Sequence, residues 1–180
     1  MSEEDLVIRL ASSADFEQIV SIDDDACALF ERAGVRLDFG PDHPYARAER
    51  ARWLQSARAG TVFLAGRAAA VPVGLLVMSR ADGEPLLDQL SIRMAAMRQG
   101  LGRRLLHRAI AWAGDQPLWL TTYAHLPWNR PFYERYGFAV VAESACGPDI
   151  RAELAEQRRW LPHPEQRVAM RRLPQGPATR

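Results

Sequence analysis

The chain has 180 residues, of which 48% are hydrophobic and 25% charged, a size and composition typical of one soluble globular domain. All 23 basic residues are Arg, which excludes Schiff-base chemistry and the phosphate-loop Lys. Two cysteines are too few for a disulfide framework or a tetrahedral zinc site. We expect a cytoplasmic protein without a membrane span, with one domain over residues 1–172 and a flexible tail over 173–180.

The first half of the chain predicts a strand, two helices and three further strands. Residues 6–10 alternate apolar and charged side chains, as in a half-buried strand. A Ser at position 12 or 13 caps a helix that Gly34 ends, and an Arg-rich helix follows over 46–59. We expect an antiparallel meander after it, because turn residues separate three apolar runs. Its strands cover residues 61–66, 71–79 and 85–92.

The second half alternates helices and strands. Over residues 101–113, Leu and Ala recur at helical spacing, with Arg and His on the opposite face. This order of elements predicts a mixed α/β domain built around one sheet. The remaining expected elements are helices over 128–136 and 148–159 and strands over 117–122, 138–142 and 167–171.

A glycine-rich turn, RQGLGRR at residues 98–104, joins an expected strand to the basic helix. Such a turn exposes backbone N–H groups at the positive end of the helix dipole, which suits a pyrophosphate. Its Arg side chains add guanidinium donors for phosphate. The third residue after Gly102 is Leu105, so the Rossmann spacing is missing, which argues against a dinucleotide-binding oxidoreductase. On these residues alone, a purely structural tight turn is an equal alternative.

Four segments follow one another in the chain: LLDQLSI (86–92), RQGLGRRLL (98–106), LWLTTY (118–123) and PWNRPFYERYGF (127–138). Together they resemble the GNAT superfamily of acyl-CoA-dependent N-acetyltransferases. The resemblance implies a GNAT-like fold, a central mostly antiparallel sheet with splayed strands flanked by helices. It also implies acetyl-CoA as co-substrate, with no metal. Residues 93–97, RMAAM, depart from the pattern, because Met97 stands where the family usually has Gln or Arg.

The resemblance also implies the cofactor contacts. The main chain of Leu90 and Ile92 would bind the thioester and the pantetheine arm, and residues 98–104 would bind the pyrophosphate. Asn129, the only Asn in the chain, would bind the CoA arm or an ordered water, although a helix N-cap is an alternative role. The implied cofactor-binding residues are Leu90, Ile92, Arg98, Gln99, Gly100, Leu101, Gly102, Arg103, Arg104 and Asn129.

Two catalytic residues are expected from the same pattern. Tyr133 stands where the family places its general acid, and it would stabilise the departing CoA thiolate by a hydrogen bond. A place in the apolar core is its structural alternative. Asp88 matches the position where relatives carry a Glu that acts through water as the base. His125 and water alone are alternatives to Asp88 as the base.

Charge is distributed unevenly along the chain. Residues 1–40 hold ten acids and three Arg, whereas residues 41–180 hold twelve acids and twenty Arg. The acids Asp23, Asp24, Asp25 and Glu31 would therefore attract a cationic amine, although solvated helix faces would give the same pattern. The spread of Arg among acids argues against nucleic acid.

We therefore expect an N-acetyltransferase that acts on the amine of a small molecule or of a protein terminus. The alternative is an acyl-CoA-binding regulatory or interaction module with a degenerate catalytic centre. Apolar residues around Trp160 and Leu161 would allow a homodimer.

Overall fold

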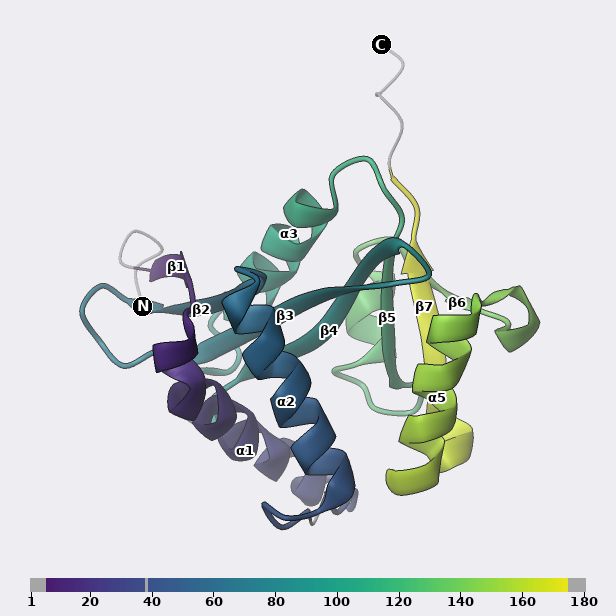
Figure 1. Cartoon of the computed structure of the whole chain (residues 1–180), viewed down its shortest axis with the longest axis horizontal. Helices are drawn as coiled ribbons and strands as arrows, with labels where there is room; N and C mark the ends of the chain where they lie inside the picture. The colour runs from purple at the N-terminus through teal and green to yellow at the C-terminus, as the bar shows by residue number, and fades with distance from the viewer. Residues whose placement is uncertain (1–5, 38, 175–180) are drawn as a thin grey trace. The chain divides into compact units, whose positions relative to one another are not determined.

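The computed structural model describes residues 6–37 and 39–174 of the chain. Within them, seven strands form one mixed sheet in the order β1-β2-β3-β4-β5-β7-β6, flanked by helices, which confirms the predicted α/β class (Figure 1). The strands are β1 (Leu6–Leu10), β2 (Val62–Arg67), β3 (Gly74–Ala81), β4 (Glu84–Ile92), β5 (Leu118–Tyr123), β6 (Phe138–Val141) and β7 (Arg167–Arg172). The helices are α1 (Phe16–Arg32), α2 (Pro44–Arg58), α3 (Leu101–Ala113), α4 (Arg130–Glu134) and α5 (Pro148–Trp160).

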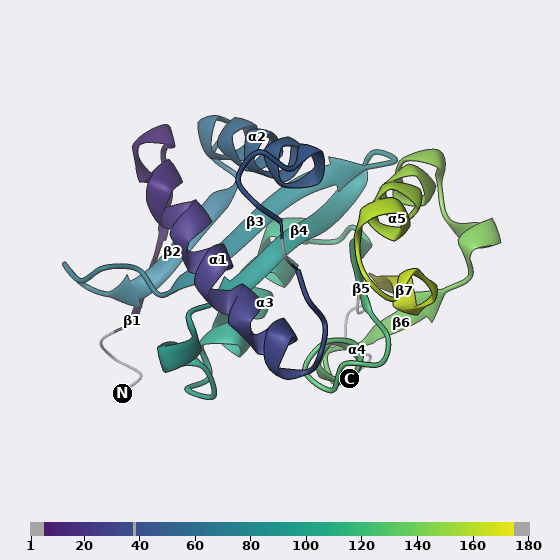
Figure 2. The same ribbon diagram turned by 90° about the horizontal axis from the view of Figure 1, so that it is seen from below.

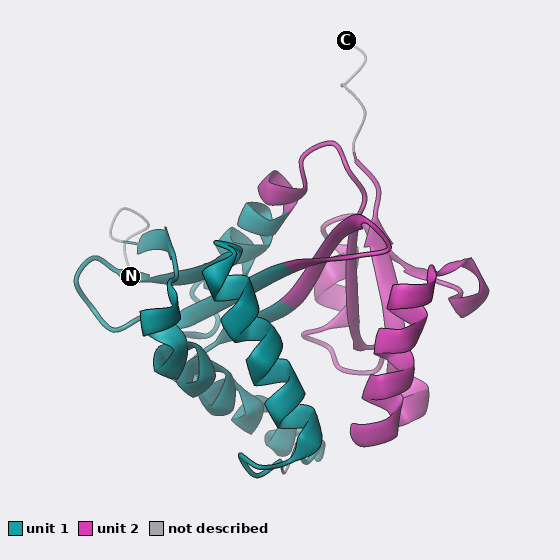
Figure 3. Cartoon of the chain, viewed as in Figure 1, with its two compact units in different colours: residues 1–78, 89–109 teal, residues 79–88, 110–180 magenta. Residues whose placement is uncertain are grey.

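The chain divides into two compact units (Figure 3). Unit 1 consists of residues 1–78 and 89–109, and unit 2 of residues 79–88 and 110–180. Strands β3 and β4 contribute residues to both units. A single domain over residues 1–172 stays a prediction, and residues 175–180 of the expected tail lie outside the described residues. In the described part of the chain, no helix is long and apolar enough to cross a membrane.

Unit 1 has an apolar core on each face of its strands. β2 pairs antiparallel with both β1 and β3, so alternate residues point to opposite faces. Helices α1 and α2 lie side by side and cover one face (Figures 1 and 2). The buried residues of this layer are Ala11, Ile19, Ile22, Trp53, Ala57, Val62, Leu64, Leu75 and Val77.

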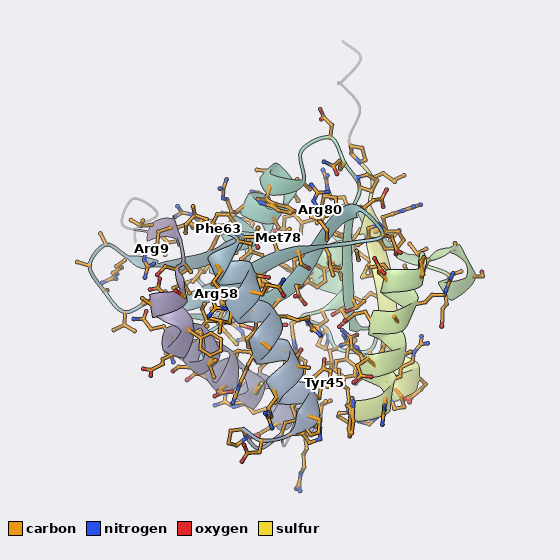
Figure 4. All side chains as sticks on the ribbon, viewed as in Figure 1. Arg9, Tyr45, Arg58, Phe63, Met78 and Arg80 are labelled. Atoms are coloured by element: carbon orange, nitrogen blue, oxygen red, sulfur yellow. The ribbon has the colours of Figure 1, made fainter. Side chains whose placement is uncertain are left out.

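Helix α3 packs on the opposite face of unit 1. The guanidinium of Arg108 lies 4.4 Å from the ring centre of Phe63 (labelled in Figure 4), which pairs with Leu76 of β3. An added Cβ at Gly74 would lie 3.0 Å from Leu101 and 3.1 Å from Leu105, so the first turns of α3 approach β3 closely. This contact places the beginning of α3, and with it the glycine-rich turn, against the sheet.

Unit 2 joins part of the sheet to α5. β5 pairs in parallel with β4 at Leu86 and Leu87, and β7 lies antiparallel between β5 and β6. Helix α5 covers one face of these strands with Ile150 and Leu154, which are buried. The turn between β3 and β4 fixes the beginning of α5, because the Asp82 carboxylate accepts hydrogen bonds from the α5 backbone.

Several predicted elements differ by a few residues at their ends from the observed ones, and three of these differences have a clear description. Helix α2 begins at Pro44 rather than at residue 46, because His43 caps it and Pro suits the first helical position. Strand β3 begins at Gly74, after Pro72, which has no N–H to contribute to a ladder. Helix α4 is shorter than the predicted 128–136 and covers only Arg130–Glu134.

Candidate active site

The glycine-rich turn of unit 1 leads directly into α3. Arg98 and Gly100 both have a left-handed backbone, with φ of +61° and +79°. Glycine adopts this conformation without strain, whereas it costs a residue such as Arg98 about 1 kcal/mol. The first N–H groups of an α-helix have no partner within the helix and carry its positive dipole end. The turn thus brings the N-terminal N–H groups of α3 next to residues 98–100.

The segment that departs from the family pattern, residues 93–97, is held firmly within unit 1. The Arg93 guanidinium donates to the Ser21 hydroxyl at 2.9 Å and to the Ser21 carbonyl at 3.2 Å, both on α1. The Asp25 carboxylate, also on α1, accepts from the Met94 N–H at 2.6 Å. Met97 is half-buried. These contacts fix the chain immediately before the turn, although Met97 replaces the Gln or Arg that is usual in the family.

The Arg residues of the turn have different surroundings. The side chains of Arg98 and Arg103 are exposed. The guanidinium of Arg104 instead donates to the Leu6 carbonyl of β1 at 3.0 Å, so it anchors the first strand. Gln99 folds back, and its side-chain amide donates to the Ala95 carbonyl at 3.1 Å.

Strand β4 brings a carboxylate of α1 into contact with two polar side chains. Asp23 Oδ1 accepts from Gln89 Nε2 and from Ser91 Oγ, each at 2.6 Å. These two residues flank Leu90, one of the predicted cofactor contacts, while Ile92 is buried at the end of the strand. Burial raises the pKa of Asp23 above its ordinary value, and the two hydrogen bonds lower it by less.

In unit 2, Tyr133 is buried on α4. Its side chain is 9% exposed and lies between the rings of Phe132 and Phe138, with ring centres 5.2 and 5.7 Å away. Burial raises the pKa of Tyr133 to about 12, and the positive charge of Arg167 opposes this change. The phenol is therefore neutral at physiological pH and can act as a hydrogen-bond donor.

Asn129 precedes α4 and lies one turn before Tyr133, whose N–H donates to the Asn129 carbonyl at 3.1 Å. It occupies the N-cap position of α4, as the alternative predicted, but its side chain makes no capping hydrogen bond. Asp88 is half-buried on β4. His125 is exposed, with its ring centre 5.5 Å from those of Tyr123 and His163.

Neither cysteine has the environment of a nucleophile. Burial and nearby carboxylates, that of Asp23 first, raise the pKa of the half-buried Cys27 thiol. Cys146 is buried, which also raises its thiol pKa. Among residues 6–37 and 39–174, no group of three or more His, Cys, Asp or Glu side chains could hold a metal ion.

Residues 58–140 match the family model described as the acetyltransferase (GNAT) domain, a segment that includes both the glycine-rich turn and Tyr133. These residues are a GNAT domain. The match confirms the predicted resemblance to the GNAT acetyltransferases over these residues.

Solved structures support the GNAT fold over nearly the whole chain. A Corynebacterium glutamicum protein described as histone acetyltransferase HPA2 and related acetyltransferase is 20% identical, with 97% of this chain and 99% of that one covered and a TM-score of 0.64. The PaiA N-acetyltransferase of Thermoplasma acidophilum, in complex with coenzyme A, is 16% identical, with 96% and 99% covered and the same TM-score.

A longer protein matches equally well. N-acetylglutamate synthase of Neisseria gonorrhoeae, with coenzyme A and N-acetylglutamate, is 15% identical with a TM-score of 0.64 over 95% of this chain. The match covers 35% of that protein, so this chain spans about a third of its length. These likenesses establish the fold of the GNAT domain.

Sequence reasoning missed two features of the site. The sequence grouped Asp23 with several other acids and did not predict its hydrogen bonds to Gln89 and Ser91. These partners lie 66 and 68 positions away in the chain. The same reasoning assigned Arg104 to phosphate, whereas the side chain reaches a residue 98 positions away. No signal in one sequence identifies such long-range partners.

Proposed function

We propose that this GNAT domain transfers the acetyl group of acetyl-CoA to a primary amine of a small molecule or of a protein terminus. The amine nitrogen attacks the thioester carbonyl and forms a tetrahedral intermediate with a negatively charged oxygen. The carbon–sulfur bond then breaks, the amide forms, and CoA leaves as a thiolate. The observation that carries the proposal is the left-handed turn at Arg98 and Gly100 before α3, within a chain segment that matches the family.

The cofactor contacts follow from the turn. Residues Gln99 to Arg104 bind the pyrophosphate through main-chain N–H groups, and the exposed Arg98 and Arg103 supply guanidinium groups to the phosphates. The Arg104 side chain contributes indirectly, since its bond to Leu6 holds the first turn of α3. The structurally similar T. acidophilum acetyltransferase is in complex with coenzyme A, which supports a CoA site in this fold.

The remaining cofactor contacts are assigned from the family pattern. The main chain of Leu90 and Ile92 binds the thioester and the pantetheine arm. Asn129 binds the CoA arm through its side chain, which makes no capping hydrogen bond to α4.

Tyr133 acts as a hydrogen-bond donor to the leaving sulfur. With its pKa at about 12, against about 8.5 for an ordinary thiol, full proton transfer to the thiolate is uphill by roughly 5 kcal/mol. A hydrogen bond that strengthens as sulfur becomes negative needs no such transfer, and the buried position of Tyr133 enhances it. The proton of the attacking amine goes to Asp88 through water.

Turnover of acetyl-CoA over a panel of amines, followed by released thiol, tests this function. Tyr133→Phe should lower kcat about 100-fold, because it removes one donor to developing charge. Tyr136→Phe is the matched control, since it removes a phenol from the same segment, and its kcat should stay close to that of wild type.

The outcomes of this experiment separate the two functions. Turnover that survives in Tyr133→Phe would exclude the role of that phenol. Binding of CoA without turnover of any amine would instead favour the acyl-CoA-binding module, and absence of CoA binding would overturn both.

A further inference from the structure

Asp23 is a carboxylate whose hydrogen-bond donors are both neutral. Within the described residues it forms no ion pair, and both of its hydrogen-bond donors, Gln89 and Ser91, are uncharged. Gln89 Nε2 also donates to Ser91 Oγ at 2.9 Å, so the three side chains form one closed set. A carboxylate removed from water without a cation is unfavourable, and burial accordingly raises the pKa of Asp23.

The neighbouring acids of α1 are already committed to other partners. Asp24 is exposed and pairs with Arg50 of α2 at 3.2 Å. Asp25 accepts the Met94 N–H and holds the segment before the glycine-rich turn. Asp24 raises and Arg50 lowers the pKa of Asp23 at a distance, each by less than burial does. Asp23 thus differs from Asp24 and Asp25 because, among the described residues, its carboxylate has neither a direct ion pair nor a backbone N–H partner.

The geometry leaves one oxygen of Asp23 available. Both hydrogen bonds go to Oδ1, and in the part of the chain that the structure describes, Oδ2 accepts none. A carboxylate oxygen within a partly desolvated site binds a cationic N–H group strongly, since the charge-assisted bond also offsets the cost of burial.

The position of Asp23 relates it to the proposed reaction. In an extended strand, residues two apart point to the same side, so Gln89 and Ser91 both turn toward α1. The backbone of Leu90, to which we assign the thioester, lies between them. A cation bound to Asp23 is therefore held next to this segment of β4, within unit 1.

We propose that Asp23 binds the ammonium group of the acceptor, as the specificity-determining residue for a small cationic amine. This inference rests on the proposed function. It concerns binding of the protonated amine, before the proton is removed for attack. Gln89 and Ser91 are positioning residues, because they hold the carboxylate from the β4 side.

Calorimetric titration of 1,4-diaminobutane and of n-butylamine into the CoA-bound protein tests the proposal. Wild type is compared with three variants, each of which removes one negative charge at a different position: Asp23→Asn, Asp24→Asn and Asp115→Asn. Asp115 is exposed in unit 2 and serves as the control for net charge. We expect Asp23→Asn to weaken amine binding about 10- to 100-fold, the effect of losing one charge-assisted hydrogen bond. Binding by Asp24→Asn and Asp115→Asn should stay close to that of wild type.

The results distinguish a failure of this inference from a failure of the proposed function. Equal weakening in Asp24→Asn, unchanged binding in Asp23→Asn, or no binding of either amine by wild type would overturn the role of Asp23. The affinity for CoA alone tests the proposed function separately, and we expect Asp23→Asn to leave it unchanged.

A second measurement on wild type avoids any effect of substitution on folding. The ¹³C signal of the Asp23 carboxyl group is titrated with acid, with and without 1,4-diaminobutane. A bound ammonium group should lower the pKa of Asp23, whereas an unchanged pKa would refute the contact.

Discussion

The contact between Gly147 and Asp82 allows a quantitative test of how unit 2 is held together. Asp82 Oδ1 accepts from the Asp149 N–H at 2.8 Å and Oδ2 from the Ile150 N–H at 3.2 Å, while the Asp82 N–H donates to Asp149 at 2.7 Å. The β3–β4 turn thus caps α5 from 67 positions away. A Cβ added at Gly147 would lie 2.2 Å from the Asp82 carboxylate, so Gly147→Ala must displace it.

The expected cost follows from the bonds that are lost. Removal of a helix cap destabilises a protein by about 0.5–2 kcal/mol, and two bonds to a carboxylate place this case at the upper end. The backbone of Gly147, with φ of −70°, itself accepts Ala without strain. We therefore expect Gly147→Ala to lower the free energy of unfolding by about 2 kcal/mol and Tm by about 4–8 °C.

A double-mutant cycle with Asp82→Ala isolates the cause. Without the carboxylate, the added methyl group has nothing to displace, so Gly147→Ala should be nearly neutral in the Asp82→Ala background. Urea unfolding followed by circular dichroism measures all four proteins. If Gly147→Ala costs the same in both backgrounds, the clash with Asp82 is not the reason and the argument is refuted.

Three further predictions concern unit 1. Arg9 holds the pKa of Asp15 at about 2, below its ordinary 3.8, so the pair stabilises the fold above pH 4 and is lost as the pH falls toward 2. Asp15→Asn should lower the free energy of unfolding at pH 7 by about 1 kcal/mol, because Arg9 is half-exposed to solvent, and a loss that persists unchanged at pH 2 would contradict this. The raised thiol pKa of Cys27 predicts much slower iodoacetamide labelling at pH 8 in the folded than in the urea-unfolded protein; equal rates would exclude it. Arg104→Met should speed hydrogen exchange of β1 amides, since its bond to Leu6 is lost, and unchanged exchange would show that the bond is dispensable.

Local sequence signals predicted most of the fold. The helix over 101–113 agrees with the observed α3, because Leu and Ala at helical spacing are a direct consequence of one buried face. Gly34, expected at a helix end, has a positive φ that favours glycine. Ser12, one of two predicted caps, accepts from the Ala14 N–H and forms a capping box with Asp15, but it caps a short 3-10 turn, Ser13–Asp15, that leads into α1.

Tertiary partners could not be predicted in this way. Asp82 was expected only as a turn residue, and its φ of +52° agrees with that role. Its second role, as the cap of α5, depends on how two segments fold together and leaves no periodic pattern. The cofactor residues of the turn were named through a family pattern, and their contacts with CoA stay predictions.

The uneven charge of the chain gains a more specific meaning from these contacts. An excess of acids in the first 40 residues suggested a broad attractive field for a cation. The structure instead gives Asp15 and Asp24 Arg partners within unit 1, and it gives Asp25 a backbone N–H. At distances beyond the ion-pair separation, the fields of Asp15 and Asp24 are largely cancelled by their Arg partners, and salt screens exposed charges further. Selection of a cationic acceptor would then depend on Asp23, so that a single neutral substitution there should matter more than removal of any of its neighbours.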